Sequence, residues 1–176
     1  MAAESETIRA ATALGSSLAG KYMTFKLGGE EYGLEILEVR EIIGLMTITR
    51  VPKTTAYIRG IINLRGKVIP VLDLRLKFGM EKAEATDQTV IIVVQHVVGE
   101  QNITMGFLVD EVLEVLDVKS EQIEPPPDFG DASINTDFIL GVGKADKRVI
   151  FLLDIGQVLS VEETHEVAEI NAGTPQ

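Results

Sequence analysis

The chain has 176 residues, of which 45% are hydrophobic and 24% are charged, a composition typical of one ordinary globular domain or of two small ones. Its net charge of −11 at pH 7 disfavours nucleic acid and anionic lipid as partners and suits a protein with basic patches, although such a charge also serves solubility alone. Cysteine is absent, which excludes disulfides, thiolate chemistry and cysteine metal sites.

The hydropathy of the chain and the composition of its ends indicate where in the cell the protein is located. The longest purely apolar runs, such as Val90–Val94, are too short to cross a bilayer. Glu4 and Glu6 stand where a secretory signal peptide carries basic residues. We therefore expect a cytoplasmic protein that does not insert directly into a membrane. Residues 1–20 are expected to form a flexible arm and residues 161–176 a tail, while Ile155–Ala168 could extend a helix.

Short β-branched runs separated by turn residues predict about ten strands, in two groups of five, which is the pattern of small β-barrels. Gly28-Gly29 and Arg65-Gly66 mark tight turns. The segment Ile36–Ile43 also fits a helical turn, so both assignments stay open there. The expected strands are, in chain order, Tyr22–Leu27, Glu31–Ile36, Ile42–Thr49, Tyr57–Leu64, Lys67–Asp73, Thr89–Val97, Asn102–Val109, Leu113–Val118, Phe138–Val142 and Arg148–Leu153.

The two groups of strands are similar in sequence, which indicates an internal duplication. Residues 33–52 align with 106–125, and residues 57–78 align with 138–159. The alignment shifts once, where the second copy inserts the proline-rich loop Pro125–Asp137. The identical pairs include Gly33/Gly106, Glu38/Glu111, Glu41/Glu114, Pro52/Pro125, Gly60/Gly141, Leu72/Leu153 and Asp73/Asp154.

Two features follow from this repeat. Strands that are apolar on both faces, such as Val90–Val94, predict that the halves pack against each other along one buried seam. Asp73 and Asp154 each end a strand at equivalent places, so we interpret them as N-caps of short helices rather than as an acid–base pair.

Groups that carry catalysis are sparse in this sequence. His96 and His165 lack the spacing of metal ligands, and the Gly141–Lys144 segment is followed by Ala145 where a phosphate-binding loop has Ser or Thr. The carboxylates Asp110, Glu111 and Glu114 could form an acidic metal site, but a solvated face beside apolar positions explains them better. We expect no catalytic residue, no metal and no cofactor, and the alternative of a carboxylate-based, metal-dependent enzyme is the less favoured hypothesis.

The two copies differ at two loops, and such differences can point to function. Copy one carries the basic turn Asn63–Gly66, on which Arg65 is either a contact residue or an ordinary exposed turn arginine. Copy two lacks this turn and carries the proline-stiffened segment Ile123–Gly130. Its aromatic residue, Phe129, either forms a contact site or folds onto the core.

The run Arg59–Arg75, which reads RGIINLRGKVIPVLDLR, resembles the signature of the CheW family of chemotaxis coupling proteins. Glu31–Leu34, Val39–Ile43 and Phe107–Val112 are similar to the same family. The resemblance covers about Tyr22 to Ser160, and its most specific part is the N-L-R-G…I-P-V-L-D-L-R string.

This resemblance implies an all-β fold of two SH3-like five-stranded β-barrel subdomains that share an apolar seam, with short helices. The family-like domain would span residues 21–160, with subdomains at about 21–80 and 88–160 and strands that could be exchanged between them. It also implies a non-enzymatic scaffold that couples the cytoplasmic tips of methyl-accepting chemoreceptors to the regulatory domain of the histidine kinase CheA at membrane-associated receptor arrays. An adaptor of a non-motility chemosensory array is the alternative within the same class.

Site residues are implied by the same resemblance. A receptor helix would bind in a groove whose apolar members lie at the seam, and the receptor-binding positions are Val39, Glu41, Gly60, Arg65, Val90 and Ile91. The kinase-binding positions are Glu124, Asp128 and Phe129. Glu124 departs from a family position that can be basic, which puts an ion pair at that position in doubt.

Overall fold

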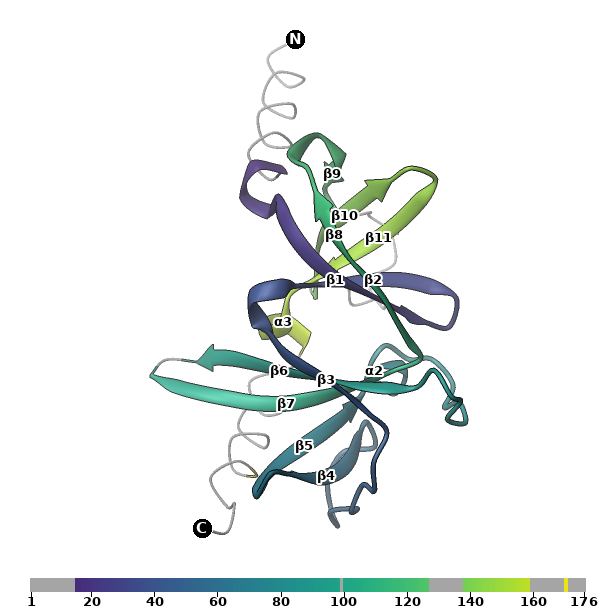
Figure 1. The fold of residues 1–176 in the computed structure, drawn as a ribbon, viewed down its shortest axis with the longest axis vertical. Helices are drawn as coiled ribbons and strands as arrows, with labels where there is room; N and C mark the ends of the chain where they lie inside the picture. The colour runs from purple at the N-terminus through teal and green to yellow at the C-terminus, as the bar shows by residue number, and fades with distance from the viewer. Residues whose placement is uncertain (1–14, 99, 127–137, 159–169, 171–176) are drawn as a thin grey trace. The chain divides into compact units, whose positions relative to one another are not determined.

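A computed structural model describes residues 15–98, 100–126, 138–158 and 170 of the chain. Most of these residues lie in strands (Figure 1). The strands are β1 (Gly20–Leu27), β2 (Glu30–Glu35), β3 (Val39–Gly44), β4 (Ile58–Leu64), β5 (Lys67–Asp73), β6 (Val90–Val98), β7 (Gln101–Val109), β8 (Glu111–Val118), β9 (Ile123–Glu124), β10 (Ile139–Ala145) and β11 (Arg148–Leu153). The helices are η1 (Ile36–Glu38), α2 (Leu74–Lys77), η2 (Ser120–Gln122) and α3 (Ile155–Val158).

The strands form two mixed sheets, so the expected β-rich fold with few short helices is confirmed. One sheet has the order β8-β1-β2-β11-β10-β9, and the other has the order β3-β6-β7-β5-β4. The segment that fitted both a strand and a helical turn contains one of each, because η1 is followed directly by β3. The strand expected at Ile42–Thr49 was misplaced, since β3 ends at Gly44 and Thr49 forms only an isolated bridge to Ile61.

The duplication is confirmed by the strand registers. Val71 pairs with Gly106 in the parallel β5–β7 ladder, and the repeat-equivalent Leu152 pairs with Gly33 in the parallel β11–β2 ladder. An irregularity between Ile58 and Gly60 in β4 recurs between Ile139 and Gly141 in β10. Each parallel ladder therefore joins a strand of one copy to a strand of the other.

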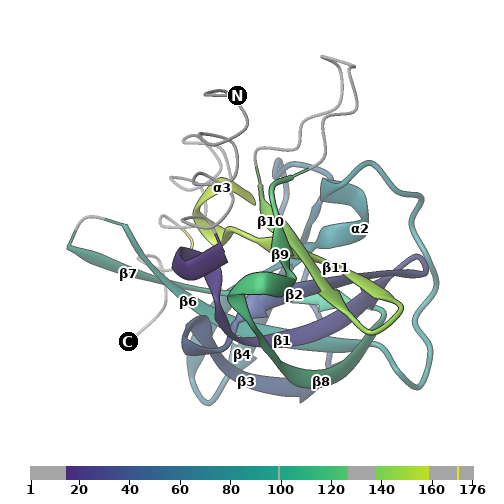
Figure 2. The same cartoon turned by 90° about the horizontal axis from the view of Figure 1, so that it is seen from above.

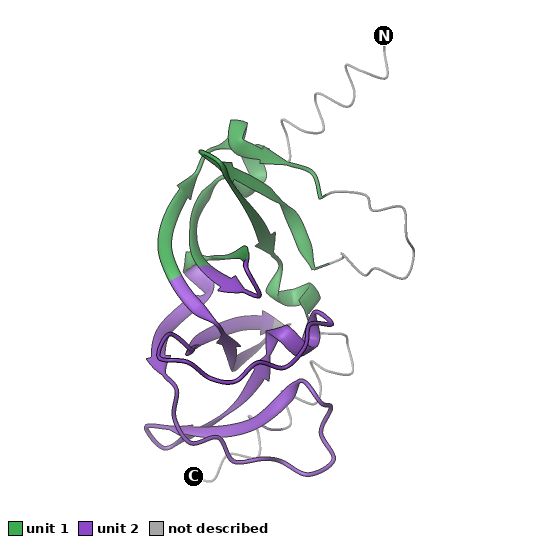
Figure 3. Ribbon diagram, turned by 90° about the vertical axis from the view of Figure 1, so that its right-hand side faces the viewer, with its two compact units in different colours: residues 1–24, 30–36, 113–158 green, residues 25–29, 37–112, 159–176 purple. Residues whose placement is uncertain are grey.

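The structure divides into two compact units that do not follow chain order (Figure 3). The described part of unit 1 comprises residues 15–24, 30–36, 113–126 and 138–158, and that of unit 2 comprises residues 25–29, 37–98, 100–112 and 170. The subdomains expected from the sequence, at about 21–80 and 88–160, are continuous in the chain apart from strands that could be exchanged. Here the exchange is large, because β6 and β7 from the second copy complete the sheet of unit 2.

Each unit has an apolar core that sequence alternation places on one face of its sheet. In unit 1, Tyr22, Val118, Ile123, Ile150 and Leu152 form a buried cluster. In unit 2, the corresponding cluster contains Ile62, Ile69, Val71, Ile91 and Val93. Burial of each large aliphatic side chain stabilises the fold by about 1.5–3 kcal/mol. The long β6–β7 hairpin, which runs from the Val90–Val109 pair to the Val98–Gln101 pair (Figure 2), supplies Ile91 and Val93 to the core of unit 2.

The two repeated aspartates cap helices, as the sequence predicts. Asp73 has an extended backbone, and its Oδ1 accepts hydrogen bonds from the backbone N–H groups of Arg75 (3.0 Å) and Leu76 (3.4 Å) at the start of α2. Asp154 Oδ1 accepts from the N–H of Gly156 (2.9 Å) at the start of α3. Both side chains thus satisfy orphan donors in a first helical turn. None of the helices in the described ranges is both long and apolar enough to span a membrane.

Candidate interaction site

The residues predicted to bind a receptor all belong to unit 2 and to its five-stranded sheet. Glu41 lies on β3, Gly60 on β4, and Arg65 in the β4–β5 turn. On β6, Val90 pairs with Gly44 of β3, and Ile91 pairs with Ile43. We call the set Val39, Glu41, Gly60, Arg65, Val90 and Ile91 the Arg65 surface.

The tightest contact on this surface joins Arg65 to Glu41. Arg65 and Gly66 both have positive φ (52° and 86°), as a two-residue hairpin turn requires at its two central positions, and Gly66 N–H donates to Asn63 Oδ1 at 2.8 Å. The turn directs the guanidinium to Glu41 across the sheet, with Nη1–Oε1 at 3.1 Å and Nη2–Oε2 at 2.5 Å. The side chain of Arg65 nevertheless remains 70% exposed.

This ion pair shifts both titrating groups. The hydrogen bonds from Arg65, together with its charge, lower the pKa of Glu41 below its usual range and outweigh the opposing effect of desolvation. The hydrogen bonds to Glu41 and its charge raise the pKa of Arg65. Both groups are therefore charged at neutral pH, and the guanidinium is held in one orientation while the rest of its surface stays open to a partner.

Gly60 has a conformational role in this surface. Its φ of 144° is unfavourable for other residues, and a Cβ at this position would collide with the carbonyl oxygen of Thr49. The close approach allows Thr49 and Ile61 to exchange two backbone hydrogen bonds of 2.8 Å. Gly60 thereby fixes the segment that follows β3.

Ile91 differs from the other members because its side chain is 0% exposed. It packs in the core of unit 2, and a Cβ at Gly106 would collide with its Cγ2 atom. Ile91 can therefore contribute to the Arg65 surface only indirectly, through its packing in the core beneath it. Val90, in contrast, is half-buried, so part of its side chain is exposed to solvent. The assignment of these residues to receptor binding stays a prediction.

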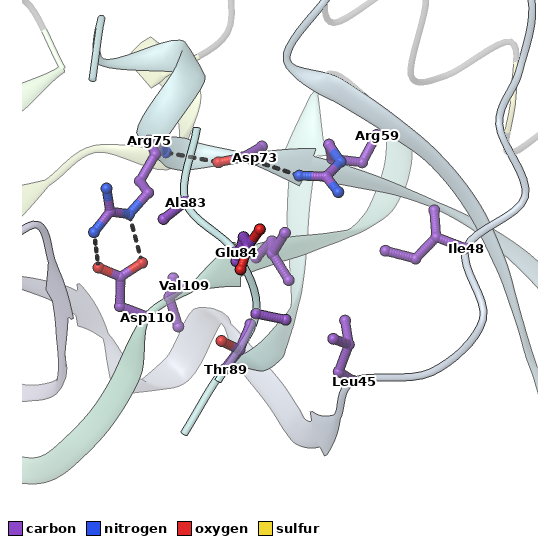
Figure 4. Close-up of a pocket in the computed structure, with 12 residues that line it drawn as sticks. Leu45, Ile48, Arg59, Asp73, Arg75, Ala83, Glu84, Thr89, Val109 and Asp110 are labelled. Atoms are coloured by element: carbon purple, nitrogen blue, oxygen red, sulfur yellow. Dashed lines mark hydrogen bonds and ion pairs between the residues drawn. The ribbon is translucent and has the colours of Figure 1, made fainter. Parts of the chain in front are cut away.

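Beside the Arg65 surface, unit 2 contains a pocket that sequence reasoning did not identify (Figure 4). Two arginines line it, and each is held by an aspartate. Arg59 Nη1 donates to Asp73 Oδ2 at 3.0 Å. Arg75 donates to both oxygens of Asp110, with Nε–Oδ1 at 2.7 Å and Nη2–Oδ2 at 2.5 Å. Both arginines fall in the signature run, but its pattern does not show which carboxylates they meet.

Of the three carboxylates considered for a metal-dependent enzyme, Asp110 and Glu114 each form an ion pair with an arginine. Asp110 also accepts the N–H of Gly28 at 2.8 Å. Burial raises the pKa of Asp110, but the hydrogen bonds from Arg75 and Gly28, with the charge of Arg75, outweigh this and leave the pKa below its usual range. Glu114, in unit 1, binds Arg148, which also holds Glu31. In the described residues, no group of three or more His, Cys, Asp or Glu side chains could hold a metal ion.

Of the residues predicted to bind the kinase, only Glu124 is described. It lies on β9 in unit 1, and its Oε1 binds Lys144 Nζ of β10 at 2.6 Å. Both side chains are more than half exposed (57% and 53%). An ion pair between Glu124 and the kinase was doubtful from the sequence. In the structure, Glu124 is already paired with Lys144 of the same unit. Asp128 and Phe129 lie outside the described residues.

Two mixed β-sheets are built from a duplicated unit, and the five-stranded one carries an exposed arginine, paired with Glu41, on its β4–β5 hairpin. These features are those of a β-rich binding module. Comparison with known proteins identifies the family. The model of the CheW-like domain matches residues 21–163, and the chain belongs to this family.

Named relatives agree with this assignment. The chain is 38% identical to the chemotaxis protein CheW of Klebsiella aerogenes over 149 residues, which cover 85% of this chain and 87% of that protein. It is 34% identical to CheW of Bacillus subtilis over 146 residues, 82% and 89% of the two chains. The crystal structure of the scaffolding protein TtCheW from Thermoanaerobacter tengcongensis superposes with a TM-score of 0.72 at 37% identity, covering 83% of this chain and 96% of that one. These likenesses support a scaffold or adaptor role in chemotaxis.

Proposed function

We propose that this protein is a non-enzymatic scaffold that couples the cytoplasmic tips of chemoreceptors to the histidine kinase CheA. Its location would be the cytoplasm, at membrane-associated receptor arrays, without direct membrane insertion. The observation that best supports this proposal is Arg65, which the β4–β5 turn and Glu41 hold in a fixed orientation while most of its side chain stays exposed.

The chemistry of the Arg65 surface suits a helical partner. The charged pair of Arg65 and Glu41 lies on the same sheet as the half-buried Val39 and Val90. Mixed apolar and charge-assisted contacts are the usual means by which a groove binds an amphipathic helix. An acidic or carbonyl group of the receptor helix would accept from the N–H groups of the guanidinium that Glu41 does not use.

The kinase side of the proposal rests on unit 1. Glu124 and Lys144 offer one exposed charge of each sign on neighbouring strands. Rim pairs of this kind affect partner choice and association rate more than affinity. Asp128 and Phe129, which follow Glu124 in the chain, remain proposed as contacts from the sequence resemblance.

The proposal is tested by calorimetric titration of the protein with a receptor tip fragment and, separately, with the CheA regulatory domain. Binding of both partners is expected, and Arg65→Ala should weaken only the first. Lys21→Ala, which removes an exposed cation of unit 1 that has no ion pair among the described residues, is the charge-matched control. Failure of the wild-type protein to bind either partner would contradict the proposal.

A further inference from the structure

Arg59 is present in only one copy of the duplicated unit. Asp73 accepts its Nη1 donor, and the side chain of Asp73 is only 4% exposed. The repeat-equivalent aspartate, Asp154, caps α3 although Leu140 stands at the position equivalent to Arg59. The cap alone therefore does not require an arginine, although Asp73 is buried and Asp154 is only half-buried, so Arg59 also neutralises a carboxylate that has lost its water.

Arg59 retains donors that can bind a partner. In the described part of the chain, its guanidinium makes one hydrogen bond, to Asp73, and its side chain is 28% exposed. Arg75, the other cation of the pocket, is occupied by both oxygens of Asp110 and by the carbonyl of Glu81. Among the described residues, Arg59 therefore uses one of its five N–H donors and Arg75 uses three, so Arg59 has more donors available to a partner.

Glu84 supplies the opposite group. It lines the same pocket as Arg59 (Figure 4) and is exposed. Among the described residues it forms no ion pair or hydrogen bond, including none with Arg59. The pocket therefore presents an available donor and an available acceptor that do not satisfy each other. Leu45 and Ile48 add an apolar wall.

Residues that line the pocket are direct neighbours of Arg65-surface residues on two strands. Arg59 directly precedes Gly60 on β4. On β7, Leu108 and Val109 line the pocket and pair with Ile91 and Val90 of β6. A segment that binds the Arg65 surface can therefore place a side chain into the pocket.

We propose that the pocket binds a side-chain carboxamide, from Gln or Asn, of the receptor segment that occupies the Arg65 surface; this inference rests on the proposed function. The carboxamide oxygen accepts from Arg59, and its NH2 group donates to Glu84. A carboxylate in this position would face the like charge of Glu84, and a lysine or arginine would face that of Arg59. A carboxamide is neutral and supplies an acceptor and a donor in one planar group, so it satisfies both.

The test is a double-mutant cycle between this protein and the receptor fragment. Arg59→Leu reproduces the residue found in the other copy, so its circular dichroism spectrum should match that of the wild type. Its affinity for the receptor fragment should fall about 10-fold, the loss expected for a hydrogen bond to a charged group. Lys147→Leu removes the same charge from an exposed turn of unit 1 and should leave receptor affinity unchanged.

The cycle then identifies the receptor group. Each Gln and Asn of the fragment is replaced by Leu, and one replacement should be non-additive with both Arg59→Leu and Glu84→Leu. Additivity at every carboxamide position, or unchanged affinity of Arg59→Leu, would overturn this inference. If Arg65→Ala still weakens binding in that case, the proposed function stands; if the wild-type protein does not bind the fragment, the proposed function fails first.

Discussion

Replacement of Asp110 by Asn should destabilise unit 2 measurably. Asp110 joins three groups, since its two oxygens accept two hydrogen bonds from Arg75 and one from the Gly28 N–H. Asparagine keeps one acceptor oxygen, but its NH2 group would then face donors of Arg75 or Gly28. Hydrogen bonds to charged groups contribute about 1.5–3 kcal/mol each, and partial exposure of the pair reduces this, so we expect a loss of about 2 kcal/mol.

Urea denaturation followed by circular dichroism measures this loss, which corresponds to about 4–8 °C in Tm for a chain of this size. Glu111→Gln is the matched control, because the adjacent Glu111 has no ion pair in the described ranges, and it should change stability by less than about 0.5 kcal/mol. An Asp110→Asn variant as stable as the control would contradict the structural role of this carboxylate.

The stability difference between the wild type and Asp110→Asn should also depend on pH in a definite direction. The pKa of Asp110 is lowered in the folded protein, so the folded state favours the charged carboxylate. Its stabilising contribution is present above the pKa of an unfolded aspartate, about 4, and is lost as pH falls through the lower folded pKa. The difference between the wild type and Asp110→Asn should therefore shrink in acid. A difference that grows below pH 4 would refute the reasoning.

Three further predictions concern other sites. Gly60→Ala should cost about 2 kcal/mol more than Gly66→Ala in denaturation experiments, because both positions have positive φ but only Gly60 lies against a carbonyl oxygen; equal losses would contradict this. In NMR titrations, the lowered pKa of Glu41 should rise towards its ordinary value in Arg65→Ala, and no change would show that the ion pair does not form in solution. Arg148→Met should destabilise unit 1 by about 2–3 kcal/mol, because it leaves a largely buried carboxylate without its partner, and Arg148→Lys should recover part of this loss; stability equal to the wild type in both variants would exclude the proposed role.

Much of the fold could be predicted from local sequence. Alternation of apolar residues and Gly-containing turns located β4 and β5 almost to the residue, and the repeat of Asp73 at Asp154 predicted both helix caps. These features depend on neighbours in the chain, so a single sequence contains their signals.

The exchange of strands between copies could be considered from the sequence but not established. The parallel pairing of β5 with β7 joins residues such as Val71 and Gly106, which have no local signal for each other. The misplaced strand at Ile42–Thr49 has a similar cause. Thr49 is β-branched and follows the β-branched Ile48, but its backbone partner is Ile61 across the close approach at Gly60, outside the β3–β6 ladder.

The candidate site was predicted in part. Arg65 was identified because it stands on a turn that the second copy lacks, but its partner Glu41 lies on another strand, and only the structure brings the two together. Ile91 was assigned to the surface by resemblance, although the structure buries it. Arg59 was missed because the sequence alone does not show which donors of an arginine remain unused.

The central claim is that one molecule bridges two partners, and co-sedimentation with receptor-containing membranes tests it most directly. The CheA regulatory domain is mixed with these membranes in the presence and absence of the protein. We predict that the kinase domain sediments with the membranes only when the protein is present, and that Arg65→Ala removes most of this recruitment. Sedimentation of the kinase domain that is independent of the protein, or no recruitment when it is added, would contradict the account.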